Sequence, residues 1–289
     1  EFGEMTRLSQ IARPDICVIT NIGQCHLETL GDRNGVLRAK TEIFSYMQEN
    51  GTVYLNGDDD KLKQIKEVNG KKPVYYGLDK TCDVFADNII NDGLNGVYFD
   101  AVTSGSRIPV HVAVPGIHMV SDALASVAIA TGLGMKAEEI ATGISKFTPV
   151  GGHSNIIKTD KFIIMDDCYN ANPVSMKAAI DVLASARGRK VAIIGDMFEL
   201  GTNEKMLHYD IGAYAVKKDI DCIVCAGTLA KQYVAGALAI DGNHNVLYYE
   251  NTEKALDMIK SIVKKGDSIL IKASHAMEFE KIVAVLTPA

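Results

Sequence analysis

The sequence lacks several features that would place it in a broad class of protein. No stretch approaches the roughly 20 apolar residues that a membrane-spanning helix requires, so no membrane insertion is expected. The first residues contain neither the basic segment nor the hydrophobic run of a signal peptide. The formal net charge of the 289 residues is −6, so the chain has no basic field that would attract nucleic acid.

Two nucleotide-binding motifs are also missing. The sequence contains no GxxxxGK[ST] loop, the motif whose backbone amides hold the phosphates of ATP or GTP. It contains no GxGxxG turn either, which argues against a dehydrogenase that binds a dinucleotide. We therefore do not expect this polypeptide to turn over a nucleotide on its own.

The six cysteines lack the spacing of a disulfide framework. They are scattered through apolar segments, which is typical of a protein in a reducing cytoplasm. Cys222 and Cys225 form a CxxC pair inside a segment that is predicted to be a buried strand. Because successive side chains of a strand point to opposite faces, residues three apart cannot share a metal ion or form a disulfide there. We predict no redox or metal-binding role for this pair.

The second half of the chain alternates short apolar runs with amphipathic segments. Strands are expected at residues 162–165, 190–194, 222–226, 246–249 and 268–271. Helices are expected at residues 173–186, 204–217, 228–239, 252–264 and 277–286. This alternation predicts an α/β fold with a parallel, doubly wound sheet that binds ligands at the carboxyl ends of its strands.

The first half of the chain has a less regular pattern. A strand is expected at residues 15–20, a helix at 36–48, a second strand at 52–55, β-rich structure at 84–114 and a helix at 120–133. A proline and two glycines then follow within residues 147–152, a combination that interrupts both kinds of element. We therefore predict two domains, residues 1–149 and residues 150–289.

Six segments resemble, in order, the motifs of the Mur ligases. They are TNIGQCH at 20–26, RAKTEIF at 38–44, PGIH at 115–118, DDCYNANPVSM at 166–176, GDMFELG at 195–201 and KASHAM at 272–277. Each segment alone is short, but together they extend along essentially the whole chain. The fourth and fifth are similar to those of the family member that joins D-alanyl-D-alanine to UDP-MurNAc-tripeptide.

The resemblance implies a particular domain organisation. Residues 1–149 would form the C-terminal part of the family's central ATP-binding domain, and residues 150–289 its C-terminal Rossmann-like ligase domain. The UDP-binding domain and the phosphate-binding loop would lie upstream of Glu1. We therefore expect the chain to be a catalytically inactive fragment, and we expect a monomer.

The implied reaction is ATP-dependent amide ligation in the synthesis of the peptidoglycan precursor. ATP would phosphorylate the terminal carboxylate of UDP-MurNAc-tripeptide, and the amine of D-alanyl-D-alanine would attack the acyl phosphate and expel phosphate. Magnesium would spread the charge of the transferring oxygens. The implied cofactors are thus ATP and Mg²⁺, and the implied partners are the two substrates.

His26 and Lys40 are the expected magnesium-binding and catalytic residues. His26 follows a polar turn that contains Asn21, which is expected to contact substrate. The family's lysine at the position of Lys40 is carbamylated, which would replace an ammonium with carboxylate oxygens, the ligands that hard divalent cations prefer. Two alternatives remain open: a loop histidine satisfied by the backbone, and a solvated helix lysine beside Glu42.

The expected contacts to the nucleotide include four residues of the fourth segment. The resemblance places Asp167 at the ATP ribose, and Tyr169, Asn170 and Asn172 along the nucleotide and acceptor cleft. Asn172 also directly precedes Pro173 at the start of a predicted helix. Capping of that helix would by itself explain an asparagine there.

Three further expected contacts to ATP include two departures from the family pattern. His118 matches the pattern. Asp122 stands where the family commonly has an asparagine that contacts adenine, and a carboxylate only accepts hydrogen bonds. His153 stands where an arginine is common, and a neutral histidine is a weaker partner for phosphate. Both changes would alter the affinity for ATP.

Lys272, Ser274 and His275 follow the last predicted strand and are expected to bind substrate. Lys272 or His275 would pair with the carboxylate of D-alanyl-D-alanine or contact the peptide of the precursor. Asp196 and Glu199 follow an earlier strand and are candidates at the same edge of the sheet.

Two other functions remain open. A sister ligase, such as folylpolyglutamate or cyanophycin synthetase, would share the magnesium and lysine chemistry, although the YNANP segment argues against it. A non-catalytic module that binds a nucleotide or a protein is favoured by the missing phosphate-binding loop.

Overall fold

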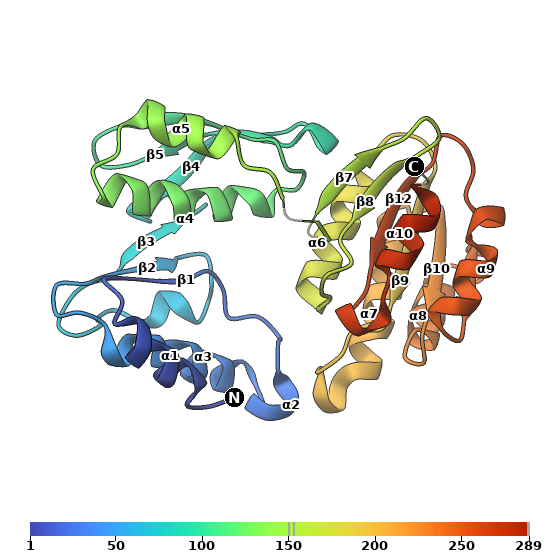
Figure 1. Ribbon diagram of the computed structural model, residues 1–289, viewed down its shortest axis with the longest axis horizontal. Helices are drawn as coiled ribbons and strands as arrows, with labels where there is room; N and C mark the ends of the chain where they lie inside the picture. The colour runs from blue at the N-terminus through green and yellow to red at the C-terminus, as the bar shows by residue number, and fades with distance from the viewer. Residues whose placement is uncertain (150, 153, 288–289) are drawn as a thin grey trace. The chain divides into compact units, whose positions relative to one another are not determined.

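Each half of the chain forms a six-stranded sheet with helices against it (Figure 1). The computed structural model describes residues 1–149, 151–152 and 154–287. The chain divides into two units, Glu1–Thr148 and Pro149–Ala289. The predicted α/β fold class is confirmed.

The sheet of the first unit runs in the order β1-β2-β3-β4-β5-β6 and is parallel over its first four strands. The last two strands continue the sheet in antiparallel hairpins. The strands are β1 (Ile16–Ile19), β2 (Thr52–Asn56), β3 (Val74–Gly77), β4 (Val84–Asn91), β5 (Val97–Val102) and β6 (Arg107–Val112). Because β1 and β2 are parallel, the loops that follow them lie at one edge of the sheet.

Helices cover both faces of this first sheet. Val36 and Ala39 of α3 (Arg33–Thr41) pack with buried residues of β1 and β2. On the other face lie α4 (His118–Gly132) and α5 (Ala137–Ser145), whose buried residues pack with those of β4, β5 and β6. The first unit also contains α1 (Glu4–Ala12) and the short α2 (Leu27–Leu30).

The helix predicted at residues 36–48 differs from the observed structure. It begins earlier, because the side chain of Asp32 accepts a hydrogen bond from Gly35 N at 2.8 Å and caps α3. It also ends earlier, at Thr41, and a 3₁₀ helix, Glu42–Tyr46, follows. The carboxylate of Glu42 accepts bonds from backbone N–H groups at the start of α1, the shortest at 2.9 Å from Gly3. Glu42 is thus engaged away from Lys40.

The sheet of the second unit runs in the order β11-β10-β9-β12-β8-β7. All its neighbouring strands are parallel except β7 and β8. The strands are β7 (Asn155–Lys158), β8 (Ile163–Asp166), β9 (Lys190–Gly195), β10 (Cys222–Ala226), β11 (Val246–Tyr249) and β12 (Ser268–Lys272). Every strand predicted in this half is therefore present, and β7 is an additional edge strand.

The helices of the second unit are α6 (Pro173–Ala184), α7 (Glu204–Lys217), α8 (Lys231–Ile240), α9 (Thr252–Ile262) and α10 (Glu280–Leu286). Buried residues of α9 and α10 share one hydrophobic cluster with Cys222, Val224 and Ala226 of β10. Cys225, also fully buried, is not in that cluster, as the alternation of strand side chains predicts. Among the helices of the described residues, none has the length and apolar character needed to cross a membrane.

Two glycines allow α7 and α8 to pack closely. A Cβ atom at Gly236 would lie 1.9 Å from the carbonyl oxygen of Tyr209, and one at Gly212 would lie 2.0 Å from that of Tyr233. Both obstacles are backbone atoms, so the two helices would have to separate to admit a methyl group.

We therefore expect Gly236→Ala to destabilise the second unit by about 1–3 kcal/mol, the usual cost of overpacking. Urea denaturation followed by circular dichroism measures this change. The matched control is Gly143→Ala in α5, where a Cβ atom would meet nothing within 4 Å. That substitution should stabilise the first unit by about 0.4–1 kcal/mol. Equal effects of the two substitutions would contradict this account of the packing.

Candidate functional site

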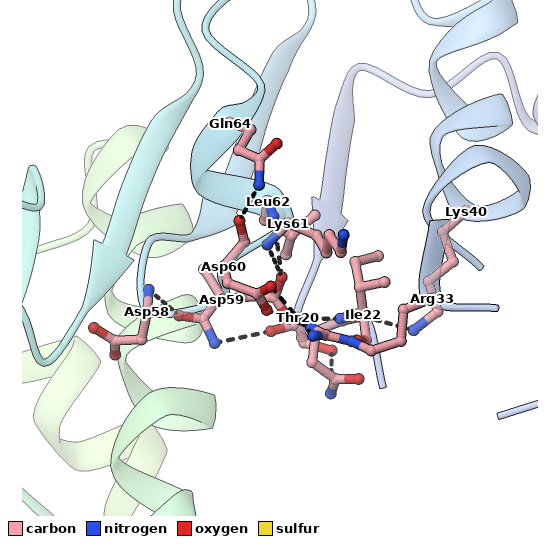
Figure 2. Close-up of polar contacts among 12 residues, drawn as sticks. Thr20, Ile22, Arg33, Lys40, Asp58, Asp59, Asp60, Lys61, Leu62 and Gln64 are labelled. Atoms are coloured by element: carbon pink, nitrogen blue, oxygen red, sulfur yellow. Dashed lines mark hydrogen bonds and ion pairs between the residues drawn. The ribbon is translucent and has the colours of Figure 1, made fainter. Parts of the chain in front are cut away.

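The loop that follows β1 carries two of the predicted site residues, and Lys40 reaches it from α3 (Figure 2). The ammonium of the half-buried Lys40 donates a 2.7 Å hydrogen bond to the backbone carbonyl of Asn21. His26 ends the loop with a positive φ of 51° and precedes α2, where its carbonyl accepts from Leu30 N at 3.0 Å. The structure thus brings Lys40 and Asn21 together and places His26 in the same loop.

The groups at this loop that could act as metal ligands determine whether it suits a magnesium ion. The carbonyl oxygen of Asn21 is a hard ligand, but the ammonium of Lys40 offers no lone pair and would repel a cation. A carbamate on Lys40 would supply oxygens at the same place, so the residues fit magnesium in that form. Within the described ranges, no group of three or more His, Cys, Asp or Glu side chains is placed to hold a metal ion.

Three residues that the sequence analysis did not select hold this loop in place. Asn56 Nδ2 donates to the carbonyl of Thr20 at 2.9 Å. The backbone N–H of Ile22 donates to Asp59 Oδ2 at 2.8 Å, and the carbonyl of Ile22 accepts from Arg33 Nε at 2.8 Å (Figure 2). For Asp59, the available signal was the polar run that directly follows β2, at the carboxyl edge of a parallel sheet.

The start of α4 carries two more predicted residues, one turn apart. The pKa of Asp122 is raised because its surroundings partly remove the carboxylate from water, and the nearby His118 opposes this shift. Asp122 also borders a cavity of about 360 Å³, whose other walls include Met119, Ile140 and Phe147. The cavity is mainly apolar and has a size typical of small-molecule sites.

In the second unit, Lys272 joins the end of β12 to the loop that follows β8. Its side chain is almost completely buried, and Nζ lies 2.6 Å from Asp167 Oδ2 and 2.9 Å from the carbonyl of Asn170. The other carboxylate oxygen of Asp167 accepts from Ser154 N at 2.9 Å. In the structure, the ammonium of Lys272 is bonded within the protein. Its contact with a substrate carboxylate stays a prediction.

The structure also describes Tyr169, Asn172, Ser274 and His275, four further predicted residues of the second unit. The rings of Tyr169 and His275, both exposed, lie 5.5 Å apart between centroids. Asn172 caps α6, as predicted, by accepting from Ser175 N at 2.9 Å. Ser274 is buried, and its Oγ accepts from the backbone N–H of Phe198 at 2.9 Å. His153 lies outside the described residues.

A buried histidine that the sequence analysis missed holds the GDMFELG segment. His208 Nε2 accepts from Met197 N at 2.9 Å, which leaves Nδ1 to donate to the carbonyl of Glu204 at 2.6 Å. The neighbouring Asp196 is also buried, and its Oδ2 accepts from Leu229 N at 3.1 Å. Burial lowers the pKa of His208, because the charged imidazolium would lose its hydration there. Protonation would also cost the bond that Nε2 accepts from Met197 N.

This lowered pKa predicts loss of stability on mild acidification. Above its ordinary pKa of about 6.5, His208 is neutral in both the folded and the unfolded chain and has no effect. As the pH falls below that value, the unfolded chain binds a proton that the folded chain does not, so stability decreases by up to about 1.4 kcal/mol per pH unit. Urea denaturation at pH 7.5 and 5.5 tests this expectation. The decrease should be smaller in His208→Gln, and equal decreases in both proteins would contradict it.

Two family models match the chain. The Mur ligase middle domain matches residues 1–130, and the Mur ligase glutamate ligase domain matches residues 154–275. The UDP-N-acetylmuramoyl-tripeptide–D-alanyl-D-alanine ligase of Bacillus subtilis (strain 168) is 34% identical over 284 residues, which cover 97% of the chain and 61% of that protein. The ligase of the same name from Escherichia coli (strain K12) is 28% identical, with coverage of 98% and 62%. The chain thus spans about three fifths of the length of these relatives.

Solved structures with the same fold include two proteins described as MurF. The chain superposes on MurF from Acinetobacter baumannii with a TM-score of 0.89 at 30% identity, covering 99% of this chain and 62% of that one. It superposes on the MurF ligase of Thermotoga maritima in complex with ADP with a TM-score of 0.84 at 25% identity, covering 99% and 64%.

Proposed function

We propose that this chain, which belongs to the Mur ligase family, forms the ATP-binding and acceptor-binding part of a ligase that adds D-alanyl-D-alanine. The whole enzyme would join D-alanyl-D-alanine to UDP-MurNAc-tripeptide. The observation that carries the proposal is the match, over 97% of the chain and through both domains, to the ligase of Bacillus subtilis that bears this name. The length that the chain does not cover would supply the phosphate-binding loop and the UDP-binding domain.

The residues of the first unit would act where phosphate is transferred. The terminal carboxylate of the tripeptide would attack the γ-phosphorus of ATP and release ADP, and the amine of D-alanyl-D-alanine would then displace phosphate from the acyl phosphate. A bound magnesium ion would neutralise charge on the transferring oxygens. Lys40, as a carbamate, and His26 would hold that ion, and the loop that contains Asn21 would orient substrate.

The family motifs supply candidate residues for binding the nucleotide and the acceptor. His118, Asp122 and His153 would contact ATP, as would the segment that contains Asp167, Tyr169, Asn170 and Asn172. The ADP complex of a relative with the same fold supports a nucleotide as ligand. Ser274, His275 and Lys272 would bind substrate. The bonds from Lys272 to Asp167 and Asn170 support an additional role for this lysine in holding the nucleotide-binding segment.

Phosphate release from ATP tests the proposal. We would compare this chain with the longer protein in which it is preceded by its upstream region, in the presence of Mg²⁺, UDP-MurNAc-tripeptide and D-alanyl-D-alanine. We expect release only from the longer protein and only when both substrates are present. Release without D-alanyl-D-alanine, or with glutamate in its place, would instead favour a sister ligase. Binding of ATP without any release from the longer protein would favour a non-catalytic module.

A further inference from the structure

The loop that follows β1 is bonded to other elements at three successive carbonyl groups, those of Thr20, Asn21 and Ile22 (Figure 2). Each carbonyl accepts a hydrogen bond from a side chain outside the loop. In the same order, the donors are Asn56 Nδ2 at 2.9 Å, Lys40 Nζ at 2.7 Å and Arg33 Nε at 2.8 Å. The loop is therefore fixed in position although it has no regular secondary structure.

The two carboxylate oxygens of Asp59 have different partners. Oδ1 accepts from the backbone N–H groups of Lys61 and Leu62, at 2.9 and 3.0 Å, and thereby caps the turn that Asp59 itself begins. Oδ2 accepts from the N–H of Ile22 at 2.8 Å, 37 residues earlier in the chain. The side chain of Asp59 is only 8% exposed, so water competes little for these bonds.

The N–H of Ile22 and the carbonyl of Asn21 belong to one peptide group, which is planar and rigid. Asp59 accepts from the N–H of this peptide, and Lys40 donates to its carbonyl oxygen. A carboxylate that accepts from the N–H also polarises the peptide and makes its carbonyl a stronger acceptor. The peptide thus links Asp59 to Lys40, and Arg33 holds the next carbonyl along the chain.

We propose that Asp59 and Arg33 are positioning residues of the ligase site: they fix the Asn21–Ile22 peptide and the following carbonyl, and so hold Lys40 Nζ at the loop. The proposal rests on the function proposed above for Lys40. Such supporting residues matter because a small displacement of a reacting or ligating group is costly to catalysis. Neither residue would touch substrate or nucleotide.

The sequence provides a matched control for Asp59 in its neighbour, Asp58. The carboxylate of Asp58 also accepts two backbone N–H groups, those of Leu78 at 2.6 Å and Asp79 at 3.1 Å, but it has no bond to the loop. Asp58→Asn and Asp59→Asn therefore remove the same charge from adjacent positions. Only Asp59→Asn leaves the N–H of Ile22 without a carboxylate, because the single amide oxygen of asparagine would be retained by Lys61 and Leu62.

The first test uses this chain and the rate at which an acylating reagent modifies Lys40, measured by mass spectrometry in buffer free of bicarbonate. The exposed Lys63 in the same sample is the internal reference. We expect Asp59→Asn to accelerate modification of Lys40 about fivefold, the equivalent of one net hydrogen bond. Asp58→Asn should keep the rate of Lys40 modification within about twofold of that in the wild-type protein. Equal rates in the two variants would overturn the proposal.

The second test uses the longer protein and the Mg²⁺ concentration that gives half-maximal phosphate release. Asp59→Asn should raise this concentration by about 10–100-fold, as loss of a supporting residue at a metal site usually does. The KM for D-alanyl-D-alanine should be unchanged. Arg33→Lys keeps the charge but loses the Nε donor, and it should also raise the Mg²⁺ concentration for half-maximal release. This variant provides the test if Asp59→Asn fails to fold.

The two tests separate the two proposals. A wild-type longer protein without substrate-dependent release would refute the proposed function, while the labelling of Lys40 would still test the link through the peptide. An active wild type, with Asp59→Asn no different from Asp58→Asn in Mg²⁺ dependence, would refute the positioning role alone.

Discussion

Lys272→Met should destabilise the second unit by about 3–5 kcal/mol, because it removes one partner of a buried ion pair and leaves the other charge unpaired. The side chain of Lys272 is 3% exposed and that of Asp167 is 16% exposed, and their charged atoms lie 2.6 Å apart. Methionine keeps the length of the aliphatic stem, so the expected loss comes from the missing ammonium rather than from a cavity. Urea denaturation of this chain, followed by circular dichroism, measures the change.

A double variant and an exposed pair provide the controls. Asp167→Asn together with Lys272→Met should recover much of the lost stability, because the unpaired charge is then absent. Lys281→Met removes an exposed lysine that pairs with Glu278 and should change stability by no more than about 1 kcal/mol. If Lys272→Met lowered stability no more than Lys281→Met does, the ammonium of Lys272 would have no structural role. It would then be free to bind a substrate carboxylate.

Lys40→Ala should reduce kcat of the longer protein by about 10²–10³-fold, the usual effect of removing one group that stabilises developing charge. The fold should remain intact, because Lys40 is half-buried and makes one hydrogen bond, to the carbonyl of Asn21. Initial rates of phosphate release with both substrates at saturation measure the effect. Lys63→Ala, at an exposed lysine, is the control and should retain full activity.

Chemical rescue distinguishes a carbamate on Lys40 from an ammonium. If a carbamate is the active form, a short carboxylate such as acetate or propionate should restore part of the activity of Lys40→Ala, because it returns ligand oxygens to the site. A small amine should have no such effect. Rescue by the amine alone would show that Lys40 acts as a cation.

The fold of the second unit followed largely from its sequence, because buried parallel strands and amphipathic helices produce clear local patterns. The edge strand Asn155–Lys158 was missed, since it is only four residues long and none of its side chains is fully buried. In the first unit, the helix Ala137–Ser145 was missed although its acidic first turn was visible, in which Glu139 accepts a hydrogen bond from Lys136 N at 2.9 Å. The end of the helix Arg33–Thr41 could not be predicted from the neighbouring sequence. Glu42, which follows it, bonds to residues about 36–39 positions away.

The candidate site was predictable only in part, for a similar reason. Asn21, His26 and Lys40 were selected as candidates through two short motifs, at residues 20–26 and 38–44. Asp59 was not, because its bond to Ile22 depends on the parallel pairing of β1 with β2. The bond from Lys272 to Asp167 likewise depends on the pairing of β12, which ends at Lys272, with β8. Strand periodicity assigns such a side chain to a face but does not identify its partner.

We propose above that this chain is part of a ligase that adds D-alanyl-D-alanine to UDP-MurNAc-tripeptide. The most direct measurement is the mass of the UDP-linked product that the longer protein forms from these substrates and ATP. We expect one product, which is heavier than the tripeptide precursor by the mass of D-alanyl-D-alanine less one water. Its amount should equal that of the phosphate released. Phosphate release with an unchanged precursor, or addition of a single amino acid in place of the dipeptide, would contradict it.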